Sequence, residues 1–406
     1  MIPFGTVMDR SCQDVHVQAR AAIGGLWLRT GFRNAILVAV WLAAAINLVR
    51  GYRFALGRPG MGLGDFHVYL EATRWWRGGK PLYEYATDLG LGFTYPPFAA
   101  LVLAPWGFLS DGAADVLWTL TTLVSTAAFG VVLGQRTRPE WPRAVRWAVS
   151  GALVAVLSET VLVHANLATG NISLILALLS LVECSRLFRS HRWGALSGVA
   201  TAIKLTPGLF LVLHLLVDRK RAVWSIGAAI AATALAAVAL PSESWTYWTH
   251  ALWQTGRVGE VDYLGNFTWT GVVARAGVEG GAGRLVGLAI GAVTAVAALW
   301  NARRHWEDNP VAAAAIVGCA SVVAAPISWP HHAVWLLAWA SCCLLSTSWL
   351  LRTVGALILL LLLVWVPLGS ALGVGAGGSA LAAVPVLAMS LAAVLRVPVV
   401  VERERS

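Results

Sequence analysis

Residues 32–49 read FRNAILVAVWLAAAINLV, an almost unbroken apolar run close to the length that a helix needs to cross a bilayer. Similar runs recur almost to the end of the chain. The runs at 193–204 and 207–217 are too short to cross straight, and Pro207 divides them. The segment 97–110 is also short and is predicted to be re-entrant or interfacial. We predict spans near 32–49, 112–134, 145–163, 170–188, 193–204, 207–217, 222–240, 284–303, 310–325, 331–348, 350–372 and 379–396.

The composition indicates the same fold class. Hydrophobic residues make up 58% of the 406 residues and charged residues only 12%, whereas soluble domains carry about 25% charged residues. The mean hydropathy is +0.70, and the chain contains 21 Trp, a residue that favours membrane interfaces. The sequence therefore predicts an all-α polytopic membrane protein with about 12 transmembrane helices, some of them short or re-entrant.

The distribution of charge predicts an orientation in the membrane. The net charge of +10 does not indicate a nucleic-acid partner, because the arginines lie in small clusters between apolar runs. Those clusters predict cytoplasmic tails at 1–31 and 397–406 around a single membrane domain at 32–396. Two long loops, at about 50–96 and 241–283, are then predicted to lie on the outer face of the plasma membrane.

The stretch GLGDFHVYL at 62–70 follows the first apolar run and contains Asp65, the first acidic residue after that run. The glycines beside it permit a tight turn. Apolar and aromatic residues at 66, 69, 70 and 76 form one helical stripe, which predicts an amphipathic helix on the membrane surface with Asp65 as its N-cap. Asp65 then either only caps this helix or also acts as a general base at the membrane surface.

Other polar residues are predicted to lie near the same outer face. Glu159 is an ionisable group near a predicted helix end, where it is either functional or a salt-bridge partner. Lys204 suits the binding of a phosphate, although it could instead extend its amine to the lipid headgroups. Arg257 could also bind the phosphate. Asn166 and Asn171 belong to a tight loop of small and amide residues, which could also be a simple helix start.

Two aromatic stretches could contact a lipid or a sugar. FTYPPF at 93–98 is stiffened by its prolines and could line a groove for a lipid chain or stack on a sugar ring. GNFTWTG at 265–271, with Asn266 and Trp269, is typical of sugar sites and also of ordinary interfacial loops.

SWPHHAVW at 328–335 places Pro330 in the first turn of a predicted helix, with His331 and His332 at its outer end. Adjacent residues on an α-helix point about 100° apart. We therefore predict that the two histidines do not face one site and do not share a metal ion. One of them could bind phosphate or orient a carboxylate, or the pair could simply be hydrated among the headgroups.

The order of these elements resembles that of the family-87 GT-C glycosyltransferases of actinobacteria. GDFHVY at 64–69, PLY at 81–83 and FTYPPFAAL at 93–101 are followed by Gly170-Asn171, AIKLTP at 202–207, GNFT at 265–268 and SWPHH at 328–332. The resemblance covers residues 33–350 and implies a GT-C bundle whose first outer loop carries a catalytic Asp.

The resemblance also implies an activity, namely an inverting transfer of mannose from polyprenyl-phosphate mannose to a phosphatidylinositol mannoside as an α-(1→2) link. It assigns Asp65 as the general base, and Lys204 with one of the two histidines as the donor-phosphate site. No Asp-x-Asp motif occurs in the sequence, so neither a metal nor another cofactor is expected. The expected partners are the lipid-linked donor, a mannosylated glycolipid and membrane lipids. The remaining candidates for substrate contact are Phe66, Tyr69, Tyr95, Glu159, Asn166, Asn171, Asn266, Trp269 and Trp329.

Three alternatives stay open. The acceptor could be a lipomannan or lipoarabinomannan backbone that receives α-(1→2) branches. A lipid-linked sugar flippase or transporter would predict inverted repeats and polar residues near the bilayer midplane, whereas the charged residues here lie near the ends of the runs. In a structural membrane subunit, Asp65 would be only a helix cap.

Overall fold

The computed structural model describes residues 30–57, 62–188, 190–372 and 376–398. Over these ranges the chain is helical, and its one β-pairing is an isolated bridge between Ala86 and Gly92. The predicted all-α fold is confirmed. The predicted tails at 1–31 and 397–406 fall almost wholly outside the described residues.

The helices alternate between long segments and short pieces. In chain order they are α2 (Thr30–Leu56), α3 (Gly64–Arg77), η1 (Leu82–Glu84), α4 (Pro97–Leu103), η2 (Ala104–Phe108), α5 (Asp111–Arg136), α6 (Arg143–Leu157), α7 (Val161–Thr169), α8 (Ser173–Cys184), η3 (His191–Gly194), α9 (Ala195–Ile203), α10 (Gly208–Val217), α11 (Arg219–Ala239), α12 (Pro241–Thr249), η4 (Ala251–Trp253), η5 (Thr255–Arg257), α13 (Trp269–Arg275), α14 (Gly280–His305), α15 (Pro310–Val323), η6 (Pro330–His332), α16 (Trp335–Leu344), α17 (Trp349–Leu372) and α18 (Ala376–Ala392).

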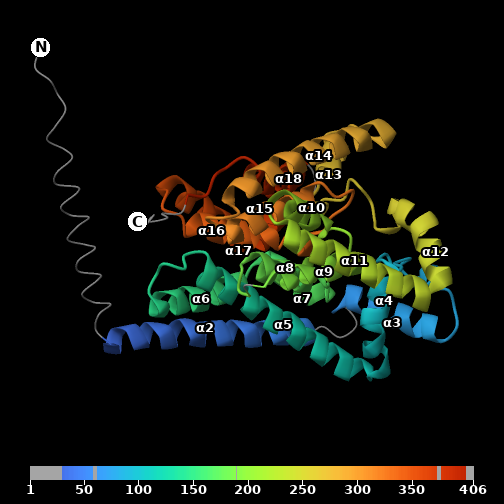
Figure 1. Cartoon of the computed structure of the whole chain (residues 1–406), viewed down its shortest axis with the longest axis horizontal. Coiled ribbons are helices and arrows are strands. Elements are labelled where there is room, and N and C mark those ends of the chain that lie inside the picture. Colours follow the sequence, from blue (N-terminus) through green and yellow to red (C-terminus); the bar gives the residue numbers. More distant parts are fainter. Residues whose placement is uncertain (1–29, 58–61, 189, 373–375, 399–406) are drawn as a thin grey trace, which may run out of the picture.

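The long helices form a bundle with α2 along one edge and α14 along the opposite edge (Figure 1). Helices α15 and α16 lie between them and form the centre of the core, because almost every side chain of both helices is buried. Small residues permit this close packing. A Cβ atom at Gly318 of α15 would lie 2.0 Å from the ring of Trp335 in α16.

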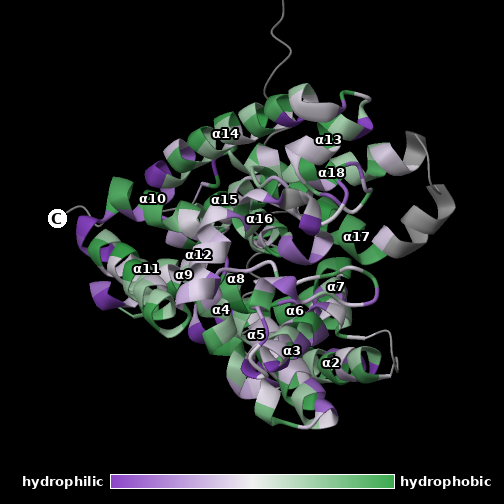
Figure 2. Cartoon of the chain, turned by 90° about the vertical axis from the view of Figure 1, so that its right-hand side faces the viewer, coloured by the Kyte–Doolittle hydropathy of each residue, from purple (hydrophilic) through white to green (hydrophobic). Residues whose placement is uncertain are grey.

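Several helices turn apolar faces outward, as lipid contact requires. The outward sides of α2, α11 and α14 are largely hydrophobic in the end-on view of Figure 2. Val38 and Ile46 of α2 and Val223 and Val238 of α11 are among the large apolar residues that are exposed. Exposed apolar surface on this scale identifies a membrane protein.

The number of spans differs from the prediction. Each predicted stretch contains a helix. With α17 counted only from Trp349 to Trp365, the helices of the described ranges that are long and apolar enough to cross a membrane are α2, α5, α11 and α14. A fifth span results if α6 and α7 are counted as one, with a bend of 63° between them. The predicted count of about 12 is therefore not confirmed, because many apolar helices are shorter than a bilayer needs.

The predicted span 145–163 contains the break between α6 and α7. Ser158 and Thr160 donate side-chain hydrogen bonds to the carbonyls of Ala155 and Leu157, at 3.0 and 2.7 Å. Hydroxyl groups that bond the preceding turn compete with the helical backbone pattern. The helix ends at this point, and α7 starts in a new direction.

The first outer loop contains the predicted amphipathic helix, α3, with Phe66, Tyr69 and Leu70 buried along one stripe. The predicted N-cap role of Asp65 is wrong. Leu63 occupies the N-cap position in a left-handed conformation with φ of 59°, and Asp65 lies within the first turn. The backbone turns at Leu63, so the Asp65 side chain is free to point away from its own helix end.

Helices α3, α4 and α12 gather at one end of the bundle (Figure 1). The two long loops contact each other there. Glu243 of α12 accepts a hydrogen bond from the Leu82 amide at 3.1 Å, and Arg257 donates to the Tyr83 carbonyl at 2.9 Å. The rings of Tyr83 and Tyr247 also lie 5.6 Å apart. These contacts build a cap over the end of the bundle from distant parts of the sequence.

Helix α9 ends at Ile203 and α10 begins after Pro207, as predicted. A buried ionic contact fixes the opposite ends of this region, since Glu183 lies 2.9 Å from His214 and accepts the Ser197 amide at 2.7 Å. Helices α8, α9 and α10 are thereby tied together far from the 204–207 turn. The 204–207 turn therefore connects α9 and α10, whose other ends are fixed by their contacts with Glu183.

The packing of α9 on α11 generates a stability prediction. A Cβ atom at Gly198 would lie 2.0 Å from the Ser225 carbonyl oxygen, whereas one at Gly227 of α11 would meet nothing within 4 Å. Overpacking of this kind costs about 1–3 kcal/mol. We expect Gly198→Ala to lower the thermal unfolding midpoint of the detergent-purified protein, measured by tryptophan fluorescence.

The matched control is Gly227→Ala, which makes the same change on a face with free space. Equal midpoints for both variants would contradict the described α9–α11 contact.

Candidate active site

A pocket of about 250 Å³ opens beneath the cap at that end of the bundle. Its walls come from α3, the 91–96 segment, the start of α8, the 204–206 turn, the α12–η5 region and the 326–332 segment. Nine residues predicted from the sequence line it: Asp65, Tyr69, Tyr95, Asn171, Lys204, Arg257, Trp329, His331 and His332.

The position of Asp65 depends on the junction between α7 and α8. Leu63 donates its amide to the Ala168 carbonyl at 2.6 Å. Gly170 ends α7 with φ of 64°, and a Cβ atom there would lie only 2.6 Å from Cβ of Phe66. Glycine therefore suits both the left-handed backbone and the close approach of α3. The junction brings Asp65 beside Asn171.

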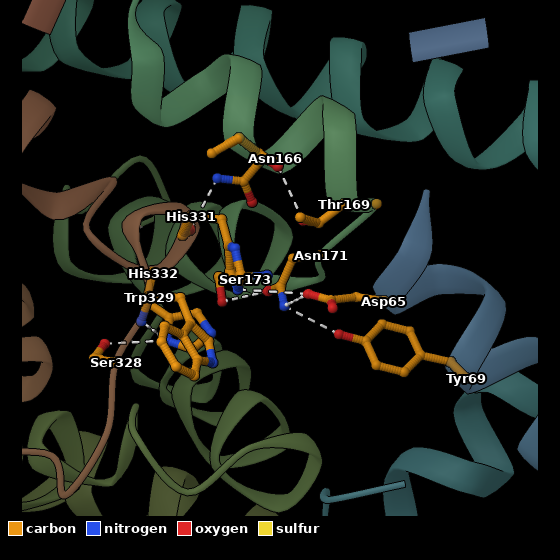
Figure 3. Close-up of polar contacts among 12 residues, drawn as sticks. Asp65, Tyr69, Asn166, Thr169, Asn171, Ser173, Ser328, Trp329, His331 and His332 are labelled. Atoms are coloured by element: carbon orange, nitrogen blue, oxygen red, sulfur yellow. Dashed lines mark hydrogen bonds and ion pairs between the residues drawn. The ribbon is translucent and has the colours of Figure 1, made fainter. Parts of the chain in front are cut away.

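Asn171 holds the Asp65 carboxylate through its side-chain amide. Its Nδ2 donates to Asp65 Oδ2 at 2.7 Å and to the Tyr69 hydroxyl at 3.1 Å. Its Oδ1 accepts from the Ser173 hydroxyl at 2.6 Å and from the Ser173 amide at 2.9 Å. Figure 3 shows Asn171 between Asp65 and Ser173. Because both ends of this buried amide are occupied, its orientation is fixed.

Lys204 lies at the other end of the same network. Its Nζ contacts Ser173 Oγ at 2.9 Å, His332 Nε2 at 2.8 Å and the Tyr95 hydroxyl at 3.4 Å. The chain from Asp65 through Asn171 and Ser173 to Lys204 therefore links an acid and a base through two neutral side chains.

The two histidines lie in a 3₁₀ turn rather than at the start of an α-helix, and both rings line the pocket. The prediction that they cannot face one site is wrong. Their rings are 4.4 Å apart at 84°, so each presents Nε2 to a different partner. His331 Nε2 lies 3.5 Å from Asp65 Oδ2, and His332 Nε2 contacts Lys204.

Burial controls the protonation of these loop residues. It lowers the pKa of Lys204 to about 7, although the nearby Asp65 partly opposes the shift. It also lowers the pKa of His331 to about 4 and that of His332 well below its usual value. Both imidazoles are therefore neutral at pH 7. Burial raises the pKa of Tyr69 and of Tyr95, so both phenols keep their protons.

The pocket has polar and apolar lining residues. The polar ones include Asp65 and Lys204, and Leu91, Leu205 and Leu252 are among the apolar ones. Trp329 also lines the pocket, and a Cβ atom at Gly259 would lie 2.6 Å from its ring. The pocket can therefore accommodate a ligand that combines a charged group with a hydrocarbon chain.

Five of the predicted residues do not line the pocket and have other partners. Phe66 stacks on Trp118 with ring centroids 4.5 Å apart, and Glu159 lies 3.6 Å from Arg50. Trp269 donates to Ser390 at 3.1 Å.

The other two, Asn166 and Asn266, support the walls of the pocket. Asn166 donates to the His331 carbonyl at 2.8 Å. Asn266 accepts the Ser328 amide at 3.1 Å and donates to the Val261 carbonyl at 2.7 Å. Both amides are buried and fix segments that carry pocket residues.

Ser173, Ser328 and Tyr247 are not among the site residues predicted from the sequence, although Ser173 contacts Lys204, Ser328 contacts His332 and Tyr247 lines the pocket. The two serines stand within or beside quoted motifs, but nothing in a sequence shows which hydroxyl contacts a distant Lys or His. Within the described residues, no group of three or more His, Cys, Asp or Glu side chains is arranged to hold a metal ion.

A family model and the similar curated proteins all indicate a glycosyltransferase. The model of glycosyltransferase family 87 matches residues 93–330. This range includes Asn171 and Lys204, while Asp65 precedes it and His331 directly follows it. No solved structure gives a significant match.

Two kinds of mycobacterial protein are similar to the chain. A polyprenol-phosphate-mannose-dependent alpha-(1-2)-phosphatidylinositol mannoside mannosyltransferase of Mycobacterium tuberculosis is 32% identical over 295 residues, covering 67% of this chain and 68% of that protein. A polyprenol-phosphate-mannose-dependent alpha-(1-2)-phosphatidylinositol pentamannoside mannosyltransferase of Mycolicibacterium smegmatis is 32% identical over 287 residues, covering 67% of each chain. The equal identities do not favour either acceptor.

The contacts of Asn266 generate a prediction about the pocket wall. Asn266→Ala leaves the buried Ser328 amide without its acceptor, which costs about 1–3 kcal/mol. We expect faster hydrogen exchange in segments 261–268 and 326–332, measured by mass spectrometry on the protein in detergent.

Asn309→Ala is the control, because Asn309 is also buried and caps α15 at the end opposite the pocket. It should leave exchange in both segments unchanged. Unchanged exchange in Asn266→Ala would show that the wall does not depend on this amide.

Proposed function

The chain belongs to glycosyltransferase family 87, and we propose that it transfers mannose from polyprenyl-phosphate mannose to a phosphatidylinositol mannoside as an α-(1→2) link. The observation that carries this proposal is the polar network that joins Asp65 to Lys204 across one pocket. The activities for which the two mycobacterial relatives are named support the same donor, linkage and acceptor class.

Asp65 is the general base in this proposal. It is the only carboxylic acid among the residues that line the pocket, and its side chain is 31% exposed. A retaining reaction by double displacement needs a second carboxyl group close enough to act beside the first. One carboxylate instead suits a single inverting displacement, in which Asp65 takes the proton of the acceptor hydroxyl as that oxygen attacks the anomeric carbon.

Asn171 and His331 position this base. The amide of Asn171 fixes one carboxylate oxygen, and the buried, neutral imidazole of His331 lies beside the same oxygen. Because Asn171 already donates to the carboxylate within the fold, the carboxylate is oriented before reaction.

Lys204 and His332 bind the phosphate of the donor. Both side chains offer hydrogen-bond donors to the pocket, and Lys204 is linked to Asp65 through Ser173 and Asn171. These donors would stabilise the negative charge that develops on the leaving phosphate. Arg257 lines the same pocket but donates to Tyr83 in the cap, so we assign it a secondary role in attracting the anionic donor.

The apolar lining residues accommodate the lipid chain. Leu205 and Leu252 line the pocket and are partly exposed, which suits the first isoprene units of a polyprenyl chain. The pocket lies at the end of the bundle that carries α3 and α12, away from the basic turn before α6. We propose that this end faces outward from the plasma membrane and that both termini are cytoplasmic.

The activity is tested with the protein in membrane vesicles, radiolabelled polyprenyl-phosphate mannose and a phosphatidylinositol mannoside. We expect a labelled glycolipid from which an α-(1→2)-specific mannosidase releases the label. Asp65→Asn should reduce the initial rate by about 10²–10⁴-fold, the usual range for loss of a general base. Its thermal unfolding midpoint should match that of the unsubstituted protein.

Asp88→Asn is the control, since Asp88 is an exposed carboxylate in the same outer loop. It should retain the full rate. Transfer at the normal rate by a folded Asp65→Asn variant would exclude Asp65 as the base, and label resistant to the mannosidase would exclude the α-(1→2) link.

A further inference from the structure

The contacts of Lys204 match the bonding capacity of a neutral amine. A lysine ammonium group offers three protons and no lone pair, whereas a neutral amine offers two protons and one lone pair. Nζ has three polar neighbours, namely Ser173 Oγ at 2.9 Å, Tyr95 Oη at 3.4 Å and His332 Nε2 at 2.8 Å. Which form is present therefore depends on whether His332 Nε2 donates or accepts.

The other ring nitrogen of His332 decides this question. The backbone amide of Trp329, which can only donate, gives a hydrogen bond to His332 Nδ1 at 3.1 Å. The Ser328 hydroxyl also lies 3.0 Å from Nδ1. Nδ1 is therefore the unprotonated nitrogen of this neutral imidazole, and Nε2 carries the proton.

The Nε2–H of His332 consequently points at Nζ of Lys204. An ammonium group would place a second donor against it at 2.8 Å, with no lone pair to accept. A neutral amine accepts this proton and uses its own two protons toward Ser173 and Tyr95. All three contacts are satisfied only by the neutral form.

Burial favours the same form. Lys204 is 9% exposed, and the pocket carboxylate Asp65 is joined to it through the side chains of Asn171 and Ser173. Desolvation lowers the pKa of Lys204 to about 7. The geometry and the environment therefore agree.

We propose that Lys204 rests as a neutral amine and takes up one proton from solvent when the anionic phosphate of the donor enters the pocket. This inference rests on the proposed function, because it assumes that a phosphate binds beside Lys204. The lone pair of Nζ forms the new N–H bond. His332 Nε2–H loses its acceptor at that moment and donates to a phosphate oxygen instead. One positive charge then faces the single negative charge of a phosphodiester.

Among the groups around this part of the pocket, Lys204 is the one whose protonation changes near pH 7. Asp65 on α3 contributes a negative charge that favours the ammonium form, and Arg257 in the cap is positive throughout. His331 in η6 has a pKa of about 4 and is neutral. The adjacent His332, Tyr69 and Tyr95 are neutral as well, since burial lowers the imidazole pKa and raises both phenol values.

The sign of the pH dependence follows. Below pH 7 the empty site already holds an ammonium group, so binding takes up no proton. Above pH 7 each bound phosphodiester requires one proton, and its affinity falls about tenfold per pH unit until the pKa of Lys204 in the complex is reached.

The experiment is calorimetric titration of the full chain in detergent with farnesyl methyl phosphate, a phosphodiester that stays singly charged at every pH used. Heats are compared in two buffers with different ionisation enthalpies, at pH 8 and at pH 5.5. We expect about one proton to be taken up per ligand at pH 8 and almost none at pH 5.5. Lys204→Arg, which is charged at both values, should bind without proton uptake.

The outcomes separate this inference from the function on which it rests. Binding at pH 8 without proton uptake, or uptake that persists in Lys204→Arg, overturns the inference and leaves the phosphate site standing. Failure of the unsubstituted protein to bind the diester at either pH overturns the phosphate site itself. The unsubstituted protein alone decides the matter if the Arg variant does not fold. Lys80→Arg, an exposed outer-loop control, should retain the uptake.

Discussion

The buried amide of Asn171 is the contact on which the rest of the site depends. Its nitrogen donates to Asp65 and its oxygen accepts from Ser173, which in turn contacts Lys204. A half-satisfied amide in an apolar bundle would cost free energy, so both halves must find partners. This requirement fixes the distance between the carboxylate and the amine before any substrate arrives.

The fold meets this requirement by ending its helices early. Asn171 follows the end of α7, Lys204 follows the end of α9, and His332 precedes α16. In a membrane protein, irregular backbone within the bilayer is tolerated only where other helices bury it or where it lines a polar cavity. The short apolar helices therefore have a physical explanation, because a full-length span at 193–217 would leave no turn to carry Lys204. The helices must end early for the turns between them to carry the residues that line the pocket.

Much of the fold could be predicted from the sequence, and less of the site. Apolar runs locate the helices, but the lengths of the helices depend on tertiary contacts such as those that break the chain at Ser158. Ordered motifs identified Asp65 and Lys204. Periodicity cannot distinguish Asn171, which contacts the carboxylate, from Asn266, which supports a wall. Sequence reasoning fails for His331 and His332 because it assigns them α-helical spacing, whereas they lie in a 3₁₀ turn that lets both rings line the pocket.

We infer that Asp65 and the Lys204–His332 pair act on opposite faces of the anomeric carbon of one transferred mannose. The most direct test is an electron cryomicroscopy structure of the protein bound to a phosphonate analogue of polyprenyl-phosphate mannose. We expect the phosphonate oxygens to lie within hydrogen-bond distance of Lys204 Nζ and His332 Nε2, with the mannose between them and Asp65. A phosphonate bound at Arg257, with the sugar turned away from Asp65, would contradict it.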